Sequence, residues 1–139
     1  MIHKKSCGII PVHKVEGDNL YLIVQQTNDS FSFPKGEQEK GESDLQTALR
    51  EFSEETGIHK IDIVEDFKVV EEYIVVRDEG KSYRKEVHYF LGFVENDVVV
   101  PQESEIQSYK WATFEEANKL IQYSNRREVL RKAKEFLLK

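Results

Sequence analysis

Residues 43–57 carry the signals of one well-defined helix, and they constrain the fold more than any other stretch of the chain. Ser43, with Gln46 three residues later, matches a capping box, in which each side chain bonds the other residue's backbone. Gly57 is the residue type that most often ends a helix. Between these ends, apolar side chains recur at helical spacing and predict a face that packs on a core: Leu45, Ala48, Leu49 and Phe52.

Three glutamates lie beside this apolar stripe. Glu51, Glu54 and Glu55 are spaced i, i+3 and i+4, which places their carboxylates along one edge of the helix. They repel one another, and Arg50, four residues before Glu54, offsets only part of that repulsion. A divalent cation would remove it, and oxygen ligands suit Mg²⁺ or Mn²⁺. The alternative is a solvated acidic helix face, which is common in a chain that is 33% charged.

The residues before the helix extend this pattern. Pro34 forces the residue before it toward extended geometry, and Gly36 allows a close turn into an acidic loop. Five residues separate Gly36 from Glu42, and seven more lead to the sequence REFSEETGI at residues 50–58. This spacing resembles the Nudix box, G-x5-E-x7-R-E-U-x-E-E-x-G-U, where U is a bulky aliphatic residue. Every fixed position is present, although Phe52 is aromatic where the family usually has an aliphatic side chain.

The Nudix resemblance implies an enzyme that hydrolyses a nucleoside diphosphate linked to another moiety, with the help of Mg²⁺. It implies that the ion is held by Glu51, Glu54, Glu55 and the Gly36 carbonyl, polarising phosphate oxygens and lowering the pKa of bound water. Glu54 is the expected proton acceptor. Arg50 is expected to fix the carboxylates by hydrogen bonding, and Glu42 to brace the loop.

Apolar alternation predicts strands through much of the remaining chain. The clearest is 87–94, with Val87, Tyr89, Leu91 and Phe93 on one face. A charged turn is expected over residues 77–82. A second capping box, Thr113 with Glu116, predicts a short helix to about residue 121, and a last helix spans roughly residues 126–138. The other expected strands are 6–13, 20–26, 61–64, 67–76, 98–100 and 109–112. This order predicts the α+β class with a mixed sheet, in agreement with the α/β/α sandwich of the Nudix family.

Length and charge limit the function. The 139 residues are expected to form one domain over residues 1–139. A net charge of 20 − 26 = −6 disfavours nonspecific attraction to nucleic acid or membranes, so a polyanionic substrate would need local cations or metal.

Cys7 is the one cysteine, which excludes an intrachain disulfide, and we expect it to be buried in the first strand. Without a secretory signal or a run near the ~20 apolar residues of a membrane span, the chain is expected to be cytoplasmic.

Other segments resemble one branch of the family, the asymmetric diadenosine tetraphosphate hydrolases. Tyr73, sixteen residues after Gly57, matches a tyrosine typical of enzymes that act on dinucleoside polyphosphates. The remaining similar segments are 6–8, 33–36, 45–51, 87–91 and 105–111. The resemblance implies asymmetric cleavage of diadenosine tetraphosphate to ATP and AMP.

A tetraphosphate bridge needs cations to bind it and to stabilise charge developing at phosphorus. Lys35, beside the loop glycine, is placed to meet a phosphate. Lys81, Arg84 and Lys85 precede the 87–94 strand, where they either contact the distal phosphates or belong to a solvated hairpin loop.

Three more residues are candidates by resemblance. Tyr73 and Tyr123 are expected to stack on adenine. Glu105 stands where the branch carries a further acid. The resemblance implies that this acid is either an extra metal ligand or the general base. Glu105 is therefore a rival to Glu54, because the sequence cannot show which of several coupled acids accepts the proton. The alternative interpretation is that Glu105 is an ordinary carboxylate of the same loop as Glu103. Trp111 is expected to belong to the core.

Two other functions stay open. One is a pyrophosphohydrolase that acts on nucleoside triphosphates or RNA triphosphate ends, against which the acidic charge argues only weakly. The other is a Nudix domain that binds nucleotides without hydrolysing them, against which the intact box speaks. For the protein as a whole we expect a small-molecule nucleotide substrate, with no membrane and no stable nucleic-acid partner.

Overall fold

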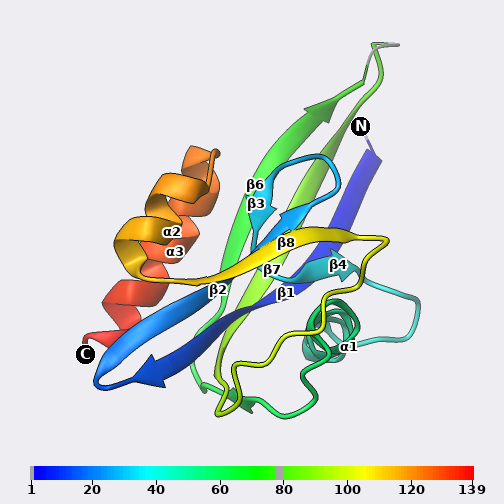
Figure 1. Ribbon diagram of the computed structural model, residues 1–139. Helices are drawn as coiled ribbons and strands as arrows, with labels where there is room; N and C mark the ends of the chain where they lie inside the picture. Colours follow the sequence, from blue (N-terminus) through cyan, green and yellow to red (C-terminus); the bar gives the residue numbers. More distant parts are fainter. Residues whose placement is uncertain (1, 78–79) are drawn as a thin grey trace.

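The computed structural model describes residues 2–77 and 80–139, and within them eight strands form one sheet with three helices packed on it (Figure 1). In chain order the elements are β1 (Ile2–Val15), β2 (Asp18–Gln26), β3 (Phe31–Ser32), β4 (Lys35–Glu37), α1 (Asp44–Thr56), β5 (Asp62–Ile63), β6 (Val69–Val76), β7 (Ser82–Phe93), β8 (Ile106–Ala112), α2 (Phe114–Leu120) and α3 (Ser124–Leu137).

Strand β1 lies at the centre of the sheet, between β2 and β7. It runs parallel to β7, from the pair Ile2 and Tyr83 to the pair Val12 and Phe93. It runs antiparallel to β2 and to β4. Strands β5 and β6 pair with β7, and β3 and β8 pair with β2, all antiparallel. The sheet is therefore mixed, as predicted.

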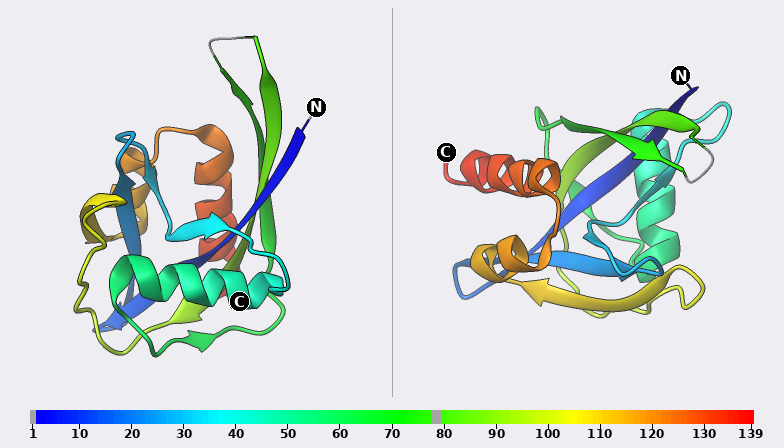
Figure 2. Two further views of the ribbon diagram at one scale, coloured as in Figure 1. Left: turned by 90° about the vertical axis from the view of Figure 1, so that its right-hand side faces the viewer. Right: turned by 90° about the horizontal axis from the view of Figure 1, so that it is seen from above.

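Both faces of the sheet are apolar, because successive side chains of a strand point to opposite faces. In β2, Tyr21 packs in the core beneath α2 and α3, which includes Leu130. The next residue, Leu22, packs on the other face with Ala48 and Phe52 of α1. Figure 2 shows α1 on one side of the sheet and α2 and α3 on the other. The α+β class and the α/β/α sandwich are confirmed.

The helix ends follow their sequence signals. Ser43 and Gln46 form the capping box of α1, and Gly57 ends that helix in the left-handed conformation with φ 73°. Thr113 and Glu116 form the capping box of α2. Within the described residues, no helix has the length and the apolar run needed to cross a membrane.

The strand predicted at residues 98–100 is wrong. These residues form a loop that is tied to the end of α1 by backbone bonds, from Val100 N to Thr56 O at 2.8 Å and from Gln102 N to Glu55 O at 3.2 Å. Val99 is buried in the core beneath α1. Of the three valines, Val99 alone packs beneath the helix, because Val98 and Val100 are 63% and 67% exposed.

Strand β7 begins at Ser82, five residues earlier than its apolar pattern predicts. Residues 82–86 are mostly polar, yet β1 and β6 supply backbone partners on both sides of them. The resulting β6–β7 hairpin extends beyond the body of the sheet (Figure 2). The charged turn predicted over residues 77–82 includes residues 78 and 79, which lie outside the described residues.

A polar cluster fixes the first turn of α1 to the sheet. The Asp44 carboxylate accepts hydrogen bonds from Lys68 at 2.7 Å and Gln38 at 2.9 Å, and Lys5 lies 2.8 Å away. The Lys5 and Lys68 ammonium groups hold the pKa of Asp44 far below its usual range. An acid in the first turn also complements the helix dipole.

We expect Asp44→Asn to lower the free energy of unfolding at pH 7 by only about 1 kcal/mol, because both lysines remain partly solvated. Since the folded-state pKa is depressed, the contribution is present above the unfolded pKa of about 4 and is lost as pH falls below it. Urea unfolding at pH 7 and pH 3 measures this. The difference between wild type and variant should shrink at pH 3, whereas Asp18→Asn, at an exposed position, should have little effect at either pH.

Candidate active site

Gly36 lies where β4 packs against α1, and it leaves room there for a carboxylate. A Cβ atom at residue 36 would stand 2.0 Å from Cδ of Glu51, and 2.2 and 2.4 Å from its carboxylate oxygens. Residue 36 therefore cannot carry a side chain unless Glu51 moves. The close approach brings the loop backbone beside the first of the three predicted acids.

Glu55 is almost fully buried, one turn of α1 beyond Glu51. Burial, aided by a hydrogen bond with the Glu51 carboxyl group, holds the pKa of Glu55 far above its usual range. Its Oε1 atom has no hydrogen-bond partner among the described residues. A buried polar atom without a partner is costly, so this pair of acids requires either a shared proton or a cation.

Arg50 ties the acids of α1 to the preceding loop. Its Nε and Nη2 atoms donate to the two oxygens of Glu42 at 2.6 and 3.0 Å, a two-pronged contact. Nη1 donates to Glu51 at 2.9 Å and to Glu54 at 3.4 Å, and Nη2 also donates to the Glu37 carbonyl at 3.1 Å. The guanidinium holds the pKa of Glu42 well below its usual range. These contacts fit the predicted roles of Arg50 and Glu42.

The oxygen donors suit a hard divalent cation. Glu51, Glu54, Glu55 and Glu105 line one cavity together with Gly36. In the part of the chain that the structure describes, no three acidic, histidine or cysteine side chains already enclose an ion position. Hydrogen bonds from Arg50 satisfy oxygens of Glu51 and Glu54 instead. The orphaned oxygen of Glu55 and the all-oxygen donor set nevertheless fit Mg²⁺ or Mn²⁺.

Two adjoining cavities meet at this acidic edge. The cavity that holds the acids has a volume of about 410 Å³. The larger cavity, of about 670 Å³, lies among β6, β7 and the start of α3. Residues that line both are Gln26, Lys35, Lys85 and Glu105. The two cavities therefore share a border of polar and charged side chains.

Lys35, at this junction, is only 8% exposed. Burial, with the nearby cations Lys85 and Arg126, lowers the pKa of Lys35 to about 7. A phosphate beside it would favour the charged ammonium form. Lys35 and Lys85 thus provide two cations between the acidic cavity and the larger one.

Comparison with known proteins agrees with this geometry. The family model described as NUDIX domain matches residues 3–133. The chain belongs to the Nudix family. Its predicted resemblance to that family, and within it to the asymmetric diadenosine tetraphosphate hydrolases, is confirmed by the relatives that follow.

The chain is 35% identical to the asymmetrical bis(5'-nucleosyl)-tetraphosphatase of Sus scrofa, over 96% of this chain and 95% of that protein. The crystal structure of a Caenorhabditis elegans Ap4A hydrolase binary complex superposes with a TM-score of 0.86 at 32% identity, covering 97% of this chain and 98% of that one. The m7GpppN-mRNA hydrolase of Saccharomyces cerevisiae is 34% identical over 88% of this chain, but the match spans only 12% of that protein.

Both predicted tyrosines line the larger cavity of the Nudix site. Tyr73 comes from β6, where it pairs in register with Lys85 of β7. Tyr123 directly precedes α3 and is 55% exposed, so its side chain is accessible to a ligand. Glu105, in the loop just before β8, lines both cavities.

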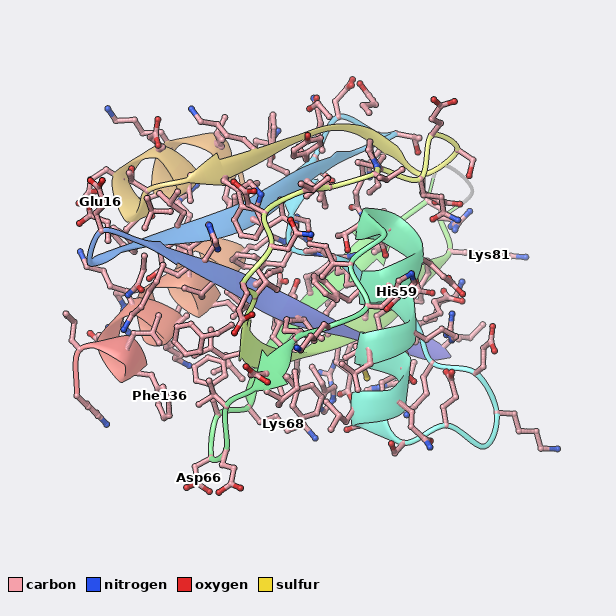
Figure 3. The ribbon with its side chains drawn as sticks, turned by 60° about the horizontal axis from the view of Figure 1, so that its bottom comes forward. Glu16, His59, Asp66, Lys68, Lys81 and Phe136 are labelled. Atoms are coloured by element: carbon pink, nitrogen blue, oxygen red, sulfur yellow. The ribbon has the colours of Figure 1, made fainter. Side chains whose placement is uncertain are left out.

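Of the three cations predicted around the β6–β7 turn, the structure brings Lys85 to the Nudix site. Lys81 is exposed and lines neither of the two cavities, and Figure 3 shows its side chain extending away from the body of the protein. Arg84 adjoins Lys85 in β7, so its side chain points to the opposite face of the sheet. Trp111 packs against the core beneath α1, as predicted, and its Nε1 donates to the Asp97 carbonyl at 2.9 Å.

Sequence reasoning missed Arg126, Glu71 and Gln26, which all line the larger cavity. Glu71 and Arg126 come from β6 and α3, 55 residues apart in the sequence. Neither has a spacing that sets it apart from the other charged residues of its element. Only the packing of α3 against β6 brings them together.

Proposed function

We propose that this Nudix protein is a metal-dependent hydrolase that cleaves diadenosine tetraphosphate asymmetrically, to ATP and AMP. The observation that carries the proposal is the junction of an acid-lined cavity with a tyrosine-lined cavity across Lys35 and Lys85. Such a site offers cations to the phosphate bridge and aromatic rings to an adenine. The names of the pig and nematode relatives, which this chain matches along nearly their whole length, support the same substrate.

The proposed metal is Mg²⁺, with Mn²⁺ as an alternative, held by the Gly36 carbonyl, Glu51, Glu54, Glu55 and Glu105. When bound, such an ion polarises phosphate oxygens and lowers the pKa of water. Its ligands would come from β4, α1 and the loop before β8.

The protein's own groups orient the reactants. Lys35 and Lys85 bind phosphates of the bridge, and Tyr73 and Tyr123 stack on an adenine. Water attacks a phosphorus, forming one P–O bond while the bond to the leaving phosphate breaks, and the Glu54 carboxylate accepts the proton of that water. Glu105 is the rival acceptor. Arg50 holds Glu51 and Glu54 in place and does not touch the substrate.

Product analysis tests this proposal. The purified protein is incubated with diadenosine tetraphosphate and Mg²⁺, and the nucleotides are separated by ion-exchange chromatography. We expect ATP and AMP in equal amounts, no turnover with EDTA, and recovery with Mg²⁺ or Mn²⁺. Release of pyrophosphate from a nucleoside triphosphate or an RNA 5' end, with no cleavage of the dinucleotide, would overturn the proposal and favour the pyrophosphohydrolase alternative. Binding without any turnover would favour the non-catalytic one.

The proposal includes a cytoplasmic location and a small-molecule substrate without a stable nucleic-acid partner. Cys7 is buried and free, which agrees with a reducing compartment.

A further inference from the structure

A buried ion pair lines the larger cavity, away from the acidic edge of the Nudix site. Arg126 Nε is 3.4 Å from Glu71 Oε1, and the two side chains are 5% and 1% exposed. The Tyr89 hydroxyl donates to the same oxygen at 3.1 Å. Burying two charges costs desolvation that their attraction barely repays, so stability alone is a poor reason for this pair.

Arg126 joins three walls of the larger cavity. Its Nε contacts Glu71 of β6, and its Nη1 donates to the Phe31 carbonyl of β3 at 3.1 Å. Its guanidinium carbon lies 5.1 Å from the centre of the Tyr123 ring. The planar guanidinium group can make these three contacts at once because its N–H donors point in different directions. A lysine ammonium group lacks this forked arrangement of donors.

Glu71 and Tyr73 are two residues apart in β6, so both point to the face of the sheet that carries the cavity. Arg126 and Tyr123 are three apart at the start of α3. The ion pair thus links the strand that carries one tyrosine to the helix that carries the other. The ion pair is one of the contacts that hold the two rings at their separation, together with the hydrogen bond from Asn125 Nδ2 to the Glu72 carbonyl at 3.0 Å.

We propose that Arg126, held by Glu71, is a positioning residue that sets Tyr123 opposite Tyr73 and so shapes the nucleoside-binding part of the site. The proposal rests on the proposed function for the identity of the nucleoside, an adenosine. In this role the Glu71–Arg126 ion pair does not contact the reacting phosphorus. Its expected effect is on nucleoside affinity, and not on the chemical step.

The test uses a double variant, because removing one partner alone leaves a buried charge that can unfold the protein. Glu71→Gln with Arg126→Met removes both charges and leaves the net charge of the cavity unchanged. Arg126→Lys keeps the charge but loses the fork. Arg131→Met is the matched control, since Arg131 lies on the same helix, is half exposed and pairs with Glu128 and Glu135.

Calorimetric titration with ATP and with inorganic tripolyphosphate, which lacks the nucleoside, supplies a readout that does not depend on turnover. For the double variant we expect the Kd of ATP to rise about tenfold and that of tripolyphosphate to change less than about twofold. Its melting temperature should stay within about 4 °C of wild type. With diadenosine tetraphosphate, KM should rise about tenfold while kcat changes less than about threefold. The Kd of ATP for Arg126→Lys should fall between the values for wild type and the double variant, and the Kd for Arg131→Met should match that of wild type.

Equal weakening of ATP and tripolyphosphate, or wild-type affinity for both, would overturn the positioning role. A double variant that melts far below wild type would show that the pair is mainly structural, and would also overturn it. Failure of the proposed function is seen separately, as a wild-type protein that binds ATP but does not cleave diadenosine tetraphosphate.

Discussion

Replacing Glu55 with glutamine is expected to lower the turnover of diadenosine tetraphosphate about a thousandfold at saturating Mg²⁺. Glu55 is the buried acid whose Oε1 lacks a partner among the described residues, and an amide there cannot neutralise a cation. Without metal, burial and the contact with Glu51 favour the neutral form of Glu55, which glutamine resembles in shape. The melting temperature without metal should therefore change little. Steady-state rates measured beside thermal unfolding separate these two effects.

Glu54→Gln and Glu105→Gln extend this experiment to the two candidate proton acceptors. Substitution of the residue that accepts the proton should lower kcat about a hundredfold or more, and substitution of the other residue should lower kcat less. Glu103→Gln is the matched control for Glu105, because it lies two residues away in the same loop, is exposed and lines neither of the two cavities. Unchanged turnover in both Glu54→Gln and Glu55→Gln would show that the proposed mechanism is wrong.

Replacing Gly36 with alanine should reduce kcat about a hundredfold or more, although only one methyl group is added. The new Cβ would stand 2.0 Å from Cδ of Glu51, so the carboxylate must leave its place beside the loop backbone. That movement also breaks the 2.9 Å hydrogen bond from Arg50. Rates at increasing Mg²⁺ measure the defect, and we expect the variant to require a higher metal concentration.

Gly41→Ala is the control for this substitution, in the loop that leads to α1. Residue 41 has φ 89°, so an alanine there costs about 1–2 kcal/mol in stability, but its Cβ would meet no atom within 4 Å. Gly41→Ala should therefore lower the melting temperature and leave kcat within about threefold of wild type. If Gly36→Ala behaved like Gly41→Ala, the close approach of Gly36 and Glu51 would have no part in catalysis.

The parts of the fold that depend on local signals were predictable. The ends of α1 and α2 follow capping boxes whose partners are three residues apart, and Gly57 ends α1 as expected. The face shared by Val87, Tyr89 and Leu91 was also predictable, because alternation along a strand needs no tertiary information. The strand predicted at residues 98–100 failed because a short run of valines does not reveal whether a neighbouring strand is available to pair with it.

The site residues also fall into those that local spacing predicted and those that only the structure could place. Glu51, Glu54, Glu55 and Arg50 are near neighbours on one helix, so their spacing alone predicted an acidic edge. The choice of Lys85 over Lys81 required the structure, since it depends on how far the β6–β7 hairpin extends beyond the cavity.

The sequence by itself determined the capped acidic helix, the glycine loop before it and the family to which both belong, because these depend on residues close together in the chain. The tertiary structure decided what surrounds that helix. It placed Gly36 against Glu51, joined the acidic cavity to the tyrosine-lined one, and buried Arg126 against Glu71. These contacts join residues from different elements, and only the packing of both sheet faces sets their distances.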